Sequence, residues 1–116
     1  MNKDDCIFCK IANGEIPSAT VYEDSICRVI LDVNPANKGH ALIIPKEHIS
    51  SVNEITGENS AVISKVFEEA PKIAAQFGMD KDGYRIVTNC GEKAGQTVHH
   101  IHFHLLAGRD LTWPPG

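Results

Sequence analysis

The chain has 116 residues, of which 42% are hydrophobic and 22% charged, a composition typical of one soluble globular domain. Its formal net charge is −4, so the chain as a whole does not attract nucleic acid or anionic lipid, and neither is expected as a partner. No apolar run approaches the roughly 20 residues of a membrane span, and the polar start does not resemble a signal peptide. We therefore expect a cytoplasmic protein, in which a close cysteine pair indicates metal binding or redox chemistry before a disulfide.

The first half of the chain is predicted to form a short helix followed by three strands. Residues 6–13 carry apolar side chains on one helical stripe, and Gly14 follows where a left-handed cap would end the helix. Three later segments are rich in β-branched residues, which predicts strands. These strands are expected over residues 19–23, 26–33 and 41–44.

The second half is predicted to contain one long helix and two more strands. Over residues 58–77 apolar side chains recur at spacings of three and four, while charged residues such as Glu69 face elsewhere. Thr56 is expected to cap this helix and Gly78 to end it, and Pro71 removes one backbone donor inside it. Hairpins on either side of one helix favour an α+β fold with an antiparallel sheet. The two remaining strands are expected over residues 84–88 and 99–106.

Three histidines alternate with apolar residues in the last expected strand. Because successive strand side chains point to opposite faces, His100, His102 and His104 should share one face while their apolar neighbours enter the core. Burying three imidazoles together is costly unless each finds a hydrogen bond, so packing alone does not account for them. They could bind a catalytic metal, or one could be a nucleophile while the others bind phosphate.

The loop before these histidines favours the nucleophile hypothesis. Residues 89–97 contain two glycines, an amide and a hydroxyl, and glycine lets backbone N–H groups approach an anion closely. A glycine-containing loop alone could simply be a turn. Next to a His-x-His-x-His segment, it predicts a phosphate-binding loop beside a nucleophile.

The histidine segment resembles the signature of the histidine triad (HIT) family, in particular its Hint branch. Residues 100–106 fit the pattern His-φ-His-φ-His-φ-φ, in which φ is hydrophobic, and three other segments also match. The resemblance implies one domain over residues 1–116, with about five antiparallel strands, one long helix and one short helix. It further implies a homodimer whose sheet continues across the subunits, with the Trp113 tail near the partner's active site. The other matching segments are residues 39–48, 95–98 and 113–116.

The resemblance also implies a covalent reaction. His102 would be the nucleophile that forms a nucleotidyl-histidine intermediate, His104 would donate to a phosphate oxygen or the leaving group, and His40 would support catalysis. The implied substrate is a purine nucleoside monophosphate joined to an amine or another leaving group. A non-catalytic nucleotide-binding regulatory module on the same fold is the alternative.

Several substrate-binding residues follow from the same resemblance. Asp32 would accept hydrogen bonds from both ribose hydroxyls, a task that suits the paired acceptors of a carboxylate. The residues implied to line the purine slot are Ile7, Phe8, Ile11, Ile30 and Val33. Those implied to bind phosphate, with His102 and His104, are Asn89, Gly95, Gln96 and Thr97.

Cys6 and Cys9 form a Cys-x-x-Cys pair. The βαβ context of a thioredoxin-like redox motif is absent, which leaves buried thiols or a zinc site that needs two further ligands. Resemblance to some bacterial family members adds His48 and His100 as those ligands. Such a zinc ion would be structural, would leave His102 and His104 free of metal, and would not be required for the chemistry.

Overall fold

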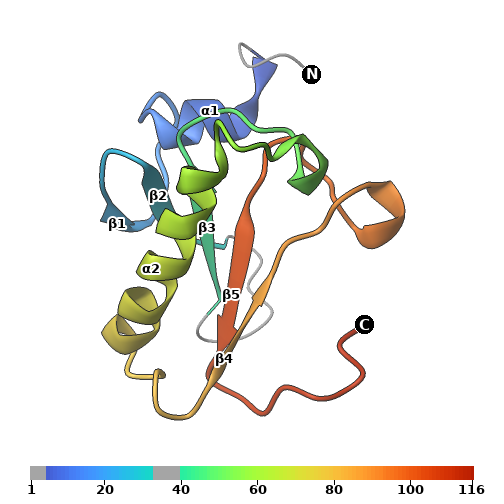
Figure 1. Ribbon diagram of the computed structural model, residues 1–116. Helices are drawn as coiled ribbons and strands as arrows, with labels where there is room; N and C mark the ends of the chain where they lie inside the picture. The colour runs from blue at the N-terminus through green and yellow to red at the C-terminus, as the bar shows by residue number, and fades with distance from the viewer. Residues whose placement is uncertain (1–4, 33–39) are drawn as a thin grey trace.

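The computed structural model describes residues 5–32 and 40–116 and contains a five-stranded sheet with two α-helices (Figure 1). Short 3-10 helices lie in the loop before the long helix and in the loop between the last two strands. In chain order the elements are α1 (Ile7–Ala12), β1 (Thr20–Glu23), β2 (Cys27–Leu31), β3 (Ala41–Pro45), η2 (Val52–Glu54), α2 (Ser60–Gln76), β4 (Tyr84–Val87), η3 (Glu92–Ala94) and β5 (Phe103–Ala107).

The strands lie in the order β1-β2-β3-β5-β4, and every neighbouring pair is antiparallel. β5 therefore lies inside the sheet, between β3 and β4, while β4 forms one edge. The register aligns Phe103 with Ile43 on one side, and His104 with Val87 on the other. This arrangement confirms the expected α+β class, with its antiparallel strands, one long helix and one short helix.

The two helices cover opposite faces of the sheet, as the alternation along β3 shows. Ala41 and Ile43 pack in the core cluster that includes buried residues of α2, whereas Leu42 and Ile44 pack in the cluster of α1. Each fully buried aliphatic side chain of this kind contributes about 1.5–3 kcal/mol relative to exposure. Figure 1 shows α2 running alongside the sheet, with α1 across one end of the molecule.

The face that carries α1 is also the face of the histidine triad. Phe103 and Leu105 of β5 belong to the cluster under α2, so the residue between them, His104, must lie on the opposite face. The sheet thus separates a hydrophobic core on one side from the candidate site on the other.

The last strand begins later than expected, at Phe103 instead of residue 99. The next position of the ladder with β3 would use Ile44 and then Pro45, and Pro45 has no backbone N–H to donate. His100 and His102 therefore lie in an irregular segment that leads into the strand. The other strands have the expected positions with ends that differ by one or two residues.

The helix ends confirm two of the three expected caps. Gly14 and Gly78 follow α1 and α2 with φ of +87° and +74°, the left-handed conformation that glycine adopts without strain. The expected N-cap at Thr56 is wrong, since Asn59 precedes the first turn of α2. The Thr56 hydroxyl instead accepts a hydrogen bond from the backbone of Glu58, within the turn before the helix.

Within the described residues, no helix has the length and apolar character required to span a membrane.

Candidate active site

The irregular segment that holds His100 and His102 is held by two hydrogen bonds from neighbouring segments. The Ile101 N–H donates to the Ile49 carbonyl at 2.6 Å, and the Thr88 hydroxyl donates to the His102 carbonyl at 2.9 Å. Ile101 is also buried in the cluster under α2. The side chains from His100 to Phe103 therefore alternate between the two faces of the sheet as in a strand, although the hydrogen-bonded ladder begins only at Phe103.

His102 is oriented by its own backbone neighbourhood. Its Nδ1 lies 2.7 Å from the carbonyl oxygen of His100, so Nδ1–H is the donor and the lone pair of the neutral ring is on Nε2. The Phe8 ring packs edge-on against the imidazole, with centroids 4.8 Å apart. Burial lowers the pKa of His102 below its ordinary value. The side chain is thus a neutral imidazole whose Nε2 keeps its lone pair.

His104 lies beside His102 and contacts His40, which in turn contacts Asp32. The ring centroids of His102 and His104 are 5.3 Å apart. Nε2 of His40 is 2.9 Å from Nδ1 of His104 and 3.2 Å from Oδ2 of Asp32. Burial, with the neighbouring His102 and His40 rings, lowers the pKa of His104. A second neutral imidazole, able to donate or accept a hydrogen bond, therefore lies next to His102.

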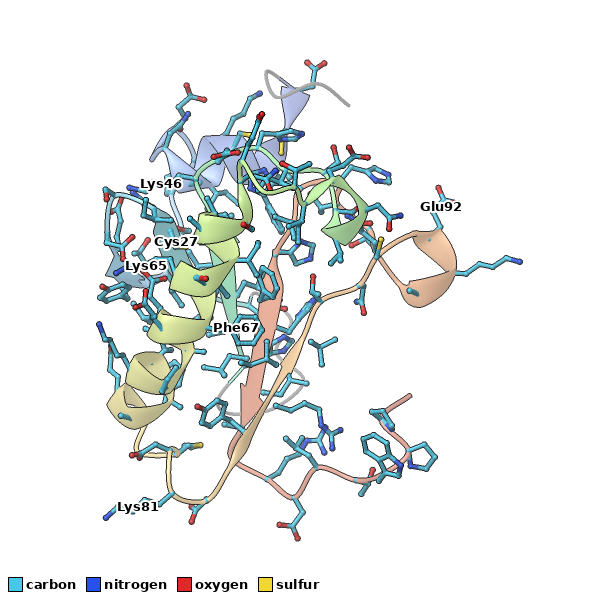
Figure 2. The ribbon with its side chains drawn as sticks, in the orientation of Figure 1. Cys27, Lys46, Lys65, Phe67, Lys81 and Glu92 are labelled. Carbon is cyan, nitrogen blue, oxygen red and sulfur yellow. The ribbon has the colours of Figure 1, made fainter. Side chains whose placement is uncertain are left out.

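The loop over residues 89–97 projects from the sheet, and Figure 2 shows Glu92 at its tip. Its conformation depends on Gln96, whose side chain accepts from the Gly91 N–H and donates to two carbonyls at 2.8 and 3.1 Å. The N–H groups of Gly95 and Gln96 donate to carbonyls within the loop. In the described part of the chain, the Thr97 N–H has no such acceptor within the loop.

Three of the expected purine-slot residues pack together on the face of α1. Phe8, Ile11 and Ile30 are buried in one cluster, whereas Ile7 is 46% exposed. Val33 lies outside the described residues. The observed cluster is consistent with both core packing and an apolar wall beside the triad.

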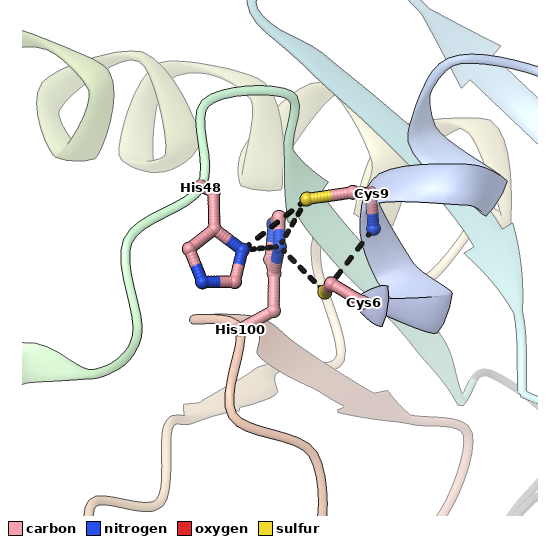
Figure 3. Close-up of side chains that lie close together, drawn as sticks. All are labelled: Cys6, Cys9, His48 and His100. Atoms are coloured by element: carbon pink, nitrogen blue, oxygen red, sulfur yellow. Dashed lines mark hydrogen bonds between the residues drawn. The ribbon is translucent and has the colours of Figure 1, made fainter. Parts of the chain in front are cut away.

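A second set of side chains brings two cysteines and two histidines together (Figure 3). Nδ1 of His100 lies 3.4 Å from Sγ of Cys6, 3.5 Å from Sγ of Cys9 and 3.3 Å from Nδ1 of His48. Nε2 of His100 donates to the Pro45 carbonyl at 2.8 Å, which leaves the Nδ1 lone pair directed at this cluster. Burial lowers the pKa of His100 to about 4, so the ring is neutral as a ligand requires.

The donor set fits a tetrahedral zinc ion. Zinc bonds of about 2.0–2.1 Å to nitrogen and 2.3 Å to sulfur place ligand atoms roughly 3.3–3.6 Å apart. The nitrogen–nitrogen and nitrogen–sulfur separations of this cluster, 3.2 to 3.5 Å, agree with that geometry. The cluster spans α1, the segment after β3 and the segment before β5, so an ion would join α1 to the sheet.

Sequence reasoning missed one buried polar group on the other face. Glu69 was expected on the polar side of α2, but it is fully buried beside Asp24 and Cys27. The sequence does contain a pattern that indicates this burial. Glu69 lies three residues after Val66 and four before Ile73, which places it on the apolar stripe of the helix.

Comparisons with known proteins agree with this geometry. Residues 13–111 match the model of the HIT domain. The chain is 47% identical over 113 residues to an uncharacterized HIT-like protein of Synechococcus elongatus, covering 97% of this chain and 98% of that protein. It is 42% identical over 108 residues to the purine nucleoside phosphoramidase of Escherichia coli, covering 93% and 91% of the two chains.

A solved structure also has this fold. A HIT family hydrolase from Legionella pneumophila superposes with a TM-score of 0.94 at 45% identity, covering 97% of this chain and all of that chain. The histidine signature, the fold and the extent of these matches lead to one assignment. The chain belongs to the HIT family and is similar throughout to its hydrolases.

Proposed function

We propose that this protein hydrolyses purine nucleoside monophosphates joined to an amine or another leaving group, through a nucleotidyl-histidine intermediate on His102. The observation that carries the proposal is the hydrogen bond from Nδ1 of His102 to the His100 carbonyl at 2.7 Å. It leaves Nε2 unprotonated in a neutral ring, which is the form in which imidazole acts as a nucleophile. The phosphoramidase relative in Escherichia coli supports the substrate class.

The proposed reaction has two displacements at the same phosphorus. First, Nε2 of His102 attacks the α-phosphorus, the bond to the leaving nitrogen breaks, and the amine departs with one proton from His104. Second, water attacks the nucleotidyl-histidine and gives one proton back to His104, the bond between phosphorus and Nε2 breaks, and the monophosphate is released. Dividing one difficult displacement in this way lowers the barrier of each step.

The surrounding residues have separate tasks in this proposal. Asp32 accepts the ribose hydroxyls, and Phe8, Ile11 and Ile30 provide an apolar wall for the base, with Ile7 and Val33 completing the slot. Asn89, Thr97 and the backbone around Gly95 and Gln96 hold the phosphate. Since the N–H groups of Gly95 and Gln96 already donate within the loop, the main donors are the Asn89 amide and Thr97. His104 donates to the leaving atom, and His40 supports it.

His102→Ala tests the nucleophile, with His99→Ala as control because His99 is an exposed histidine outside the proposed site. We expect His102→Ala to lower turnover of an adenosine phosphoramidate by more than about 1,000-fold while monophosphate binding persists, as for other nucleophile removals. Wild-type turnover in His102→Ala would exclude the covalent mechanism. Monophosphate binding without turnover of any amidate or ester by the wild type would favour the regulatory module.

We also propose that Cys6, Cys9, His48 and His100 hold a structural Zn²⁺ ion. When bound, the ion supplies a cross-link between α1 and the sheet and takes no part in the reaction. Cys9→Ser should abolish stoichiometric zinc in elemental analysis and lower thermal stability, whereas Cys90→Ser should retain both. Turnover by folded protein after chelation is expected, and loss of chemistry with full retention of the fold would contradict a purely structural ion.

We further propose a cytoplasmic homodimer. β4 is an edge strand, and edge strands readily pair with another chain. Two aromatic side chains near this edge and on α2 are exposed, Trp113 at 81% and Phe67 at 52%. In the proposed dimer the sheet continues across β4, and the Trp113 tail approaches the partner's site. The four cysteines form no disulfide in the described part of the chain, which suits a reducing compartment.

A further inference from the structure

The cluster of Cys6, Cys9, His48 and His100 has a buried side and a solvent-accessible side. Cys6 and His100 are both 0% exposed, whereas Cys9 and His48 are partly exposed. Cys9 and His48 also line a pocket of about 330 Å³. A small molecule that enters from solvent therefore reaches Sγ of Cys9 before it reaches Sγ of Cys6.

The charged side chains around this pocket balance one another. Two of them are cationic and two are anionic, so the pocket does not select for a charged molecule. It is compatible with a small neutral reagent such as hydrogen peroxide. The four charged residues are Lys10, Glu15, Lys46 and Glu47.

The two sulfur atoms lie close enough to join. Cys6 caps α1, Cys9 lies in its first turn, and the Cys9 N–H donates to Sγ of Cys6 at 3.4 Å. All ligand atoms of the cluster lie within 4.8 Å of one another, so a disulfide bond of about 2.05 Å requires the sulfur atoms to approach by roughly 2.7 Å at most. Figure 3 shows both side chains at the start of α1, facing His48 and His100.

We propose that Cys6 and Cys9 are a peroxide-sensitive modification site, where oxidation to a disulfide releases the zinc ion and detaches α1 from the sheet. This inference rests on the proposed zinc centre. Zinc holds its sulfur ligands as thiolates, which are the form of cysteine that reacts with peroxide. The reaction therefore needs no thioredoxin-like fold around the cysteine pair.

The oxidation has two steps. First, the Cys9 thiolate attacks one oxygen of hydrogen peroxide, the O–O bond breaks, and a sulfenic acid and a hydroxide ion form. Second, the Cys6 thiolate attacks Sγ of Cys9, the S–O bond breaks, and a second hydroxide ion leaves. The two sulfur atoms together lose the two electrons that reduce the peroxide. Zn²⁺ departs with its charge unchanged, because a disulfide no longer offers it thiolate ligands.

The disulfide would not replace the cross-link that the ion supplies, because both cysteines belong to the segment of α1. His48 follows β3 and His100 precedes β5, so in the proposed centre the ion connects these two segments to α1. The same helix carries Phe8, whose ring centroid lies 4.8 Å from that of His102. Oxidation would therefore loosen the apolar wall beside the triad.

Hydrogen peroxide added to the zinc-loaded full-length protein tests the modification. We expect release of about one zinc ion for each disulfide formed, measured with a chromogenic chelator, and a disulfide between Cys6 and Cys9 in peptide mapping. A thiol reductant with added zinc should restore the starting state, and Cys90→Ser should behave as the wild type. Zinc release without this disulfide, or oxidation of Cys90 while the pair stays reduced, would overturn the proposal.

Two substitutions identify the thiol that peroxide attacks first. In Cys6→Ser, which removes the second thiol, a sulfenic acid should accumulate on Cys9 and be trapped by dimedone. In Cys9→Ser, the buried Cys6 should give at least about tenfold less adduct, since oxidation follows exposure. More adduct on Cys6 than on Cys9 would contradict the proposed order. If either variant fails to fold, the wild-type mapping still decides the proposal.

Hydrogen exchange measures the detachment of α1. Its amides should exchange about tenfold or more faster in the oxidised protein than in the zinc-loaded protein. The amides of α2, which packs on the opposite face of the sheet, should be unchanged. Equal protection of α1 in both forms would overturn the inference. Untreated protein without zinc would defeat the zinc centre itself, whereas zinc-loaded protein that resists peroxide would defeat only this inference.

Discussion

His102 combines two properties that a nucleophilic imidazole needs, a fixed tautomer and a neutral ring. The His100 carbonyl supplies the first by accepting Nδ1–H at 2.7 Å. Burial supplies the second, because a ring shielded from water resists protonation. Both properties come from the backbone and the packing around one residue, and neither needs a metal on His102.

The lowered pKa of His102 predicts how activity changes with pH. An imidazolium has no lone pair for attack, so activity falls when His102 is protonated. Because the folded pKa is below the ordinary value, the neutral ring persists to more acidic pH, and the acid limb of kcat/KM should have its midpoint below about 6.5. A pH profile measured on the adenosine phosphoramidate checks this. An acid midpoint at pH 7 or above, with the protein still folded, would contradict it.

At this scale the sequence predicted the placement of the three histidines better than the contacts that the candidate residues make. Alternation and the triad signature were sufficient to place His100, His102 and His104 on one face. The contact of His40 with Asp32 and His104 joins residues up to 64 positions apart, which no local pattern encodes. The engaged N–H groups of Gly95 and Gln96 depend on the closed conformation of their loop, which a count of glycines does not reveal.

Pro45 shows how one residue shapes both parts of the histidine segment. It ends the ladder between β3 and β5 because it has no N–H, and its carbonyl accepts Nε2–H of His100. The first effect frees the segment before Phe103 from the ladder. The second directs the other nitrogen of His100 toward the cysteines. The sequence indicated the strand end at Pro45 but not its consequence for the neighbouring strand.

The packing of α2 on the β1–β2 hairpin buries a second titratable pair, Glu69 and Asp24. Burial, followed by the neighbouring Asp24 carboxylate, raises the pKa of Glu69 to about 7. Burial alone would raise the pKa of Asp24, but hydrogen bonds from Glu69 and from the Cys27 and Ile26 backbone outweigh it and hold that pKa well below its usual range. In the folded protein below about pH 7, Glu69 is thus mostly protonated beside an ionised Asp24. Figure 2 shows Cys27 and Lys65 on this side of the molecule.

The raised pKa of Glu69 makes stability depend on pH with a defined sign. Its stabilising effect is complete below the unfolded pKa, about 4.5, and is lost as pH rises through about 7. Glu69→Gln resembles the protonated acid at every pH, so its melting temperature relative to wild type should increase from pH 5 to pH 8. Thermal denaturation at both values measures this, with the exposed Glu68→Gln as control. A difference that stays constant, or falls, would contradict the assigned protonation.

At the scale of the whole molecule, the two faces of the sheet carry different features. One face packs against α2 and contributes most of the aliphatic core, while the other carries α1, the triad and the cysteine–histidine cluster. The family signature predicted this fold class in outline. It could not predict the exposed surfaces, which depend on how side chains pack in three dimensions.

The proposed dimer predicts a specific effect of a surface charge. Phe67 lies on α2 with its ring 52% exposed, labelled in Figure 2, although its ring also contacts Phe103 at a centroid distance of 6.1 Å. Phe67→Glu should shift the protein toward the mass of one chain in analytical ultracentrifugation, because a charge in an interface is costly. The exposed Lys72→Glu is the control and should retain the wild-type mass. A wild type with the mass of one chain at high concentration would exclude the dimer.

The covalent bond between His102 and the substrate phosphorus is the central claim, and it can be trapped. The wild type is mixed with an adenosine phosphoramidate labelled at phosphorus, quenched within the first turnover under alkaline conditions, and digested for mass spectrometry. We expect an adenylyl group on the peptide that contains His102, attached through nitrogen, and none in His102→Ala. Rapid turnover by the wild type with no adduct at any quench time, or an adduct on another residue, would contradict the proposed mechanism.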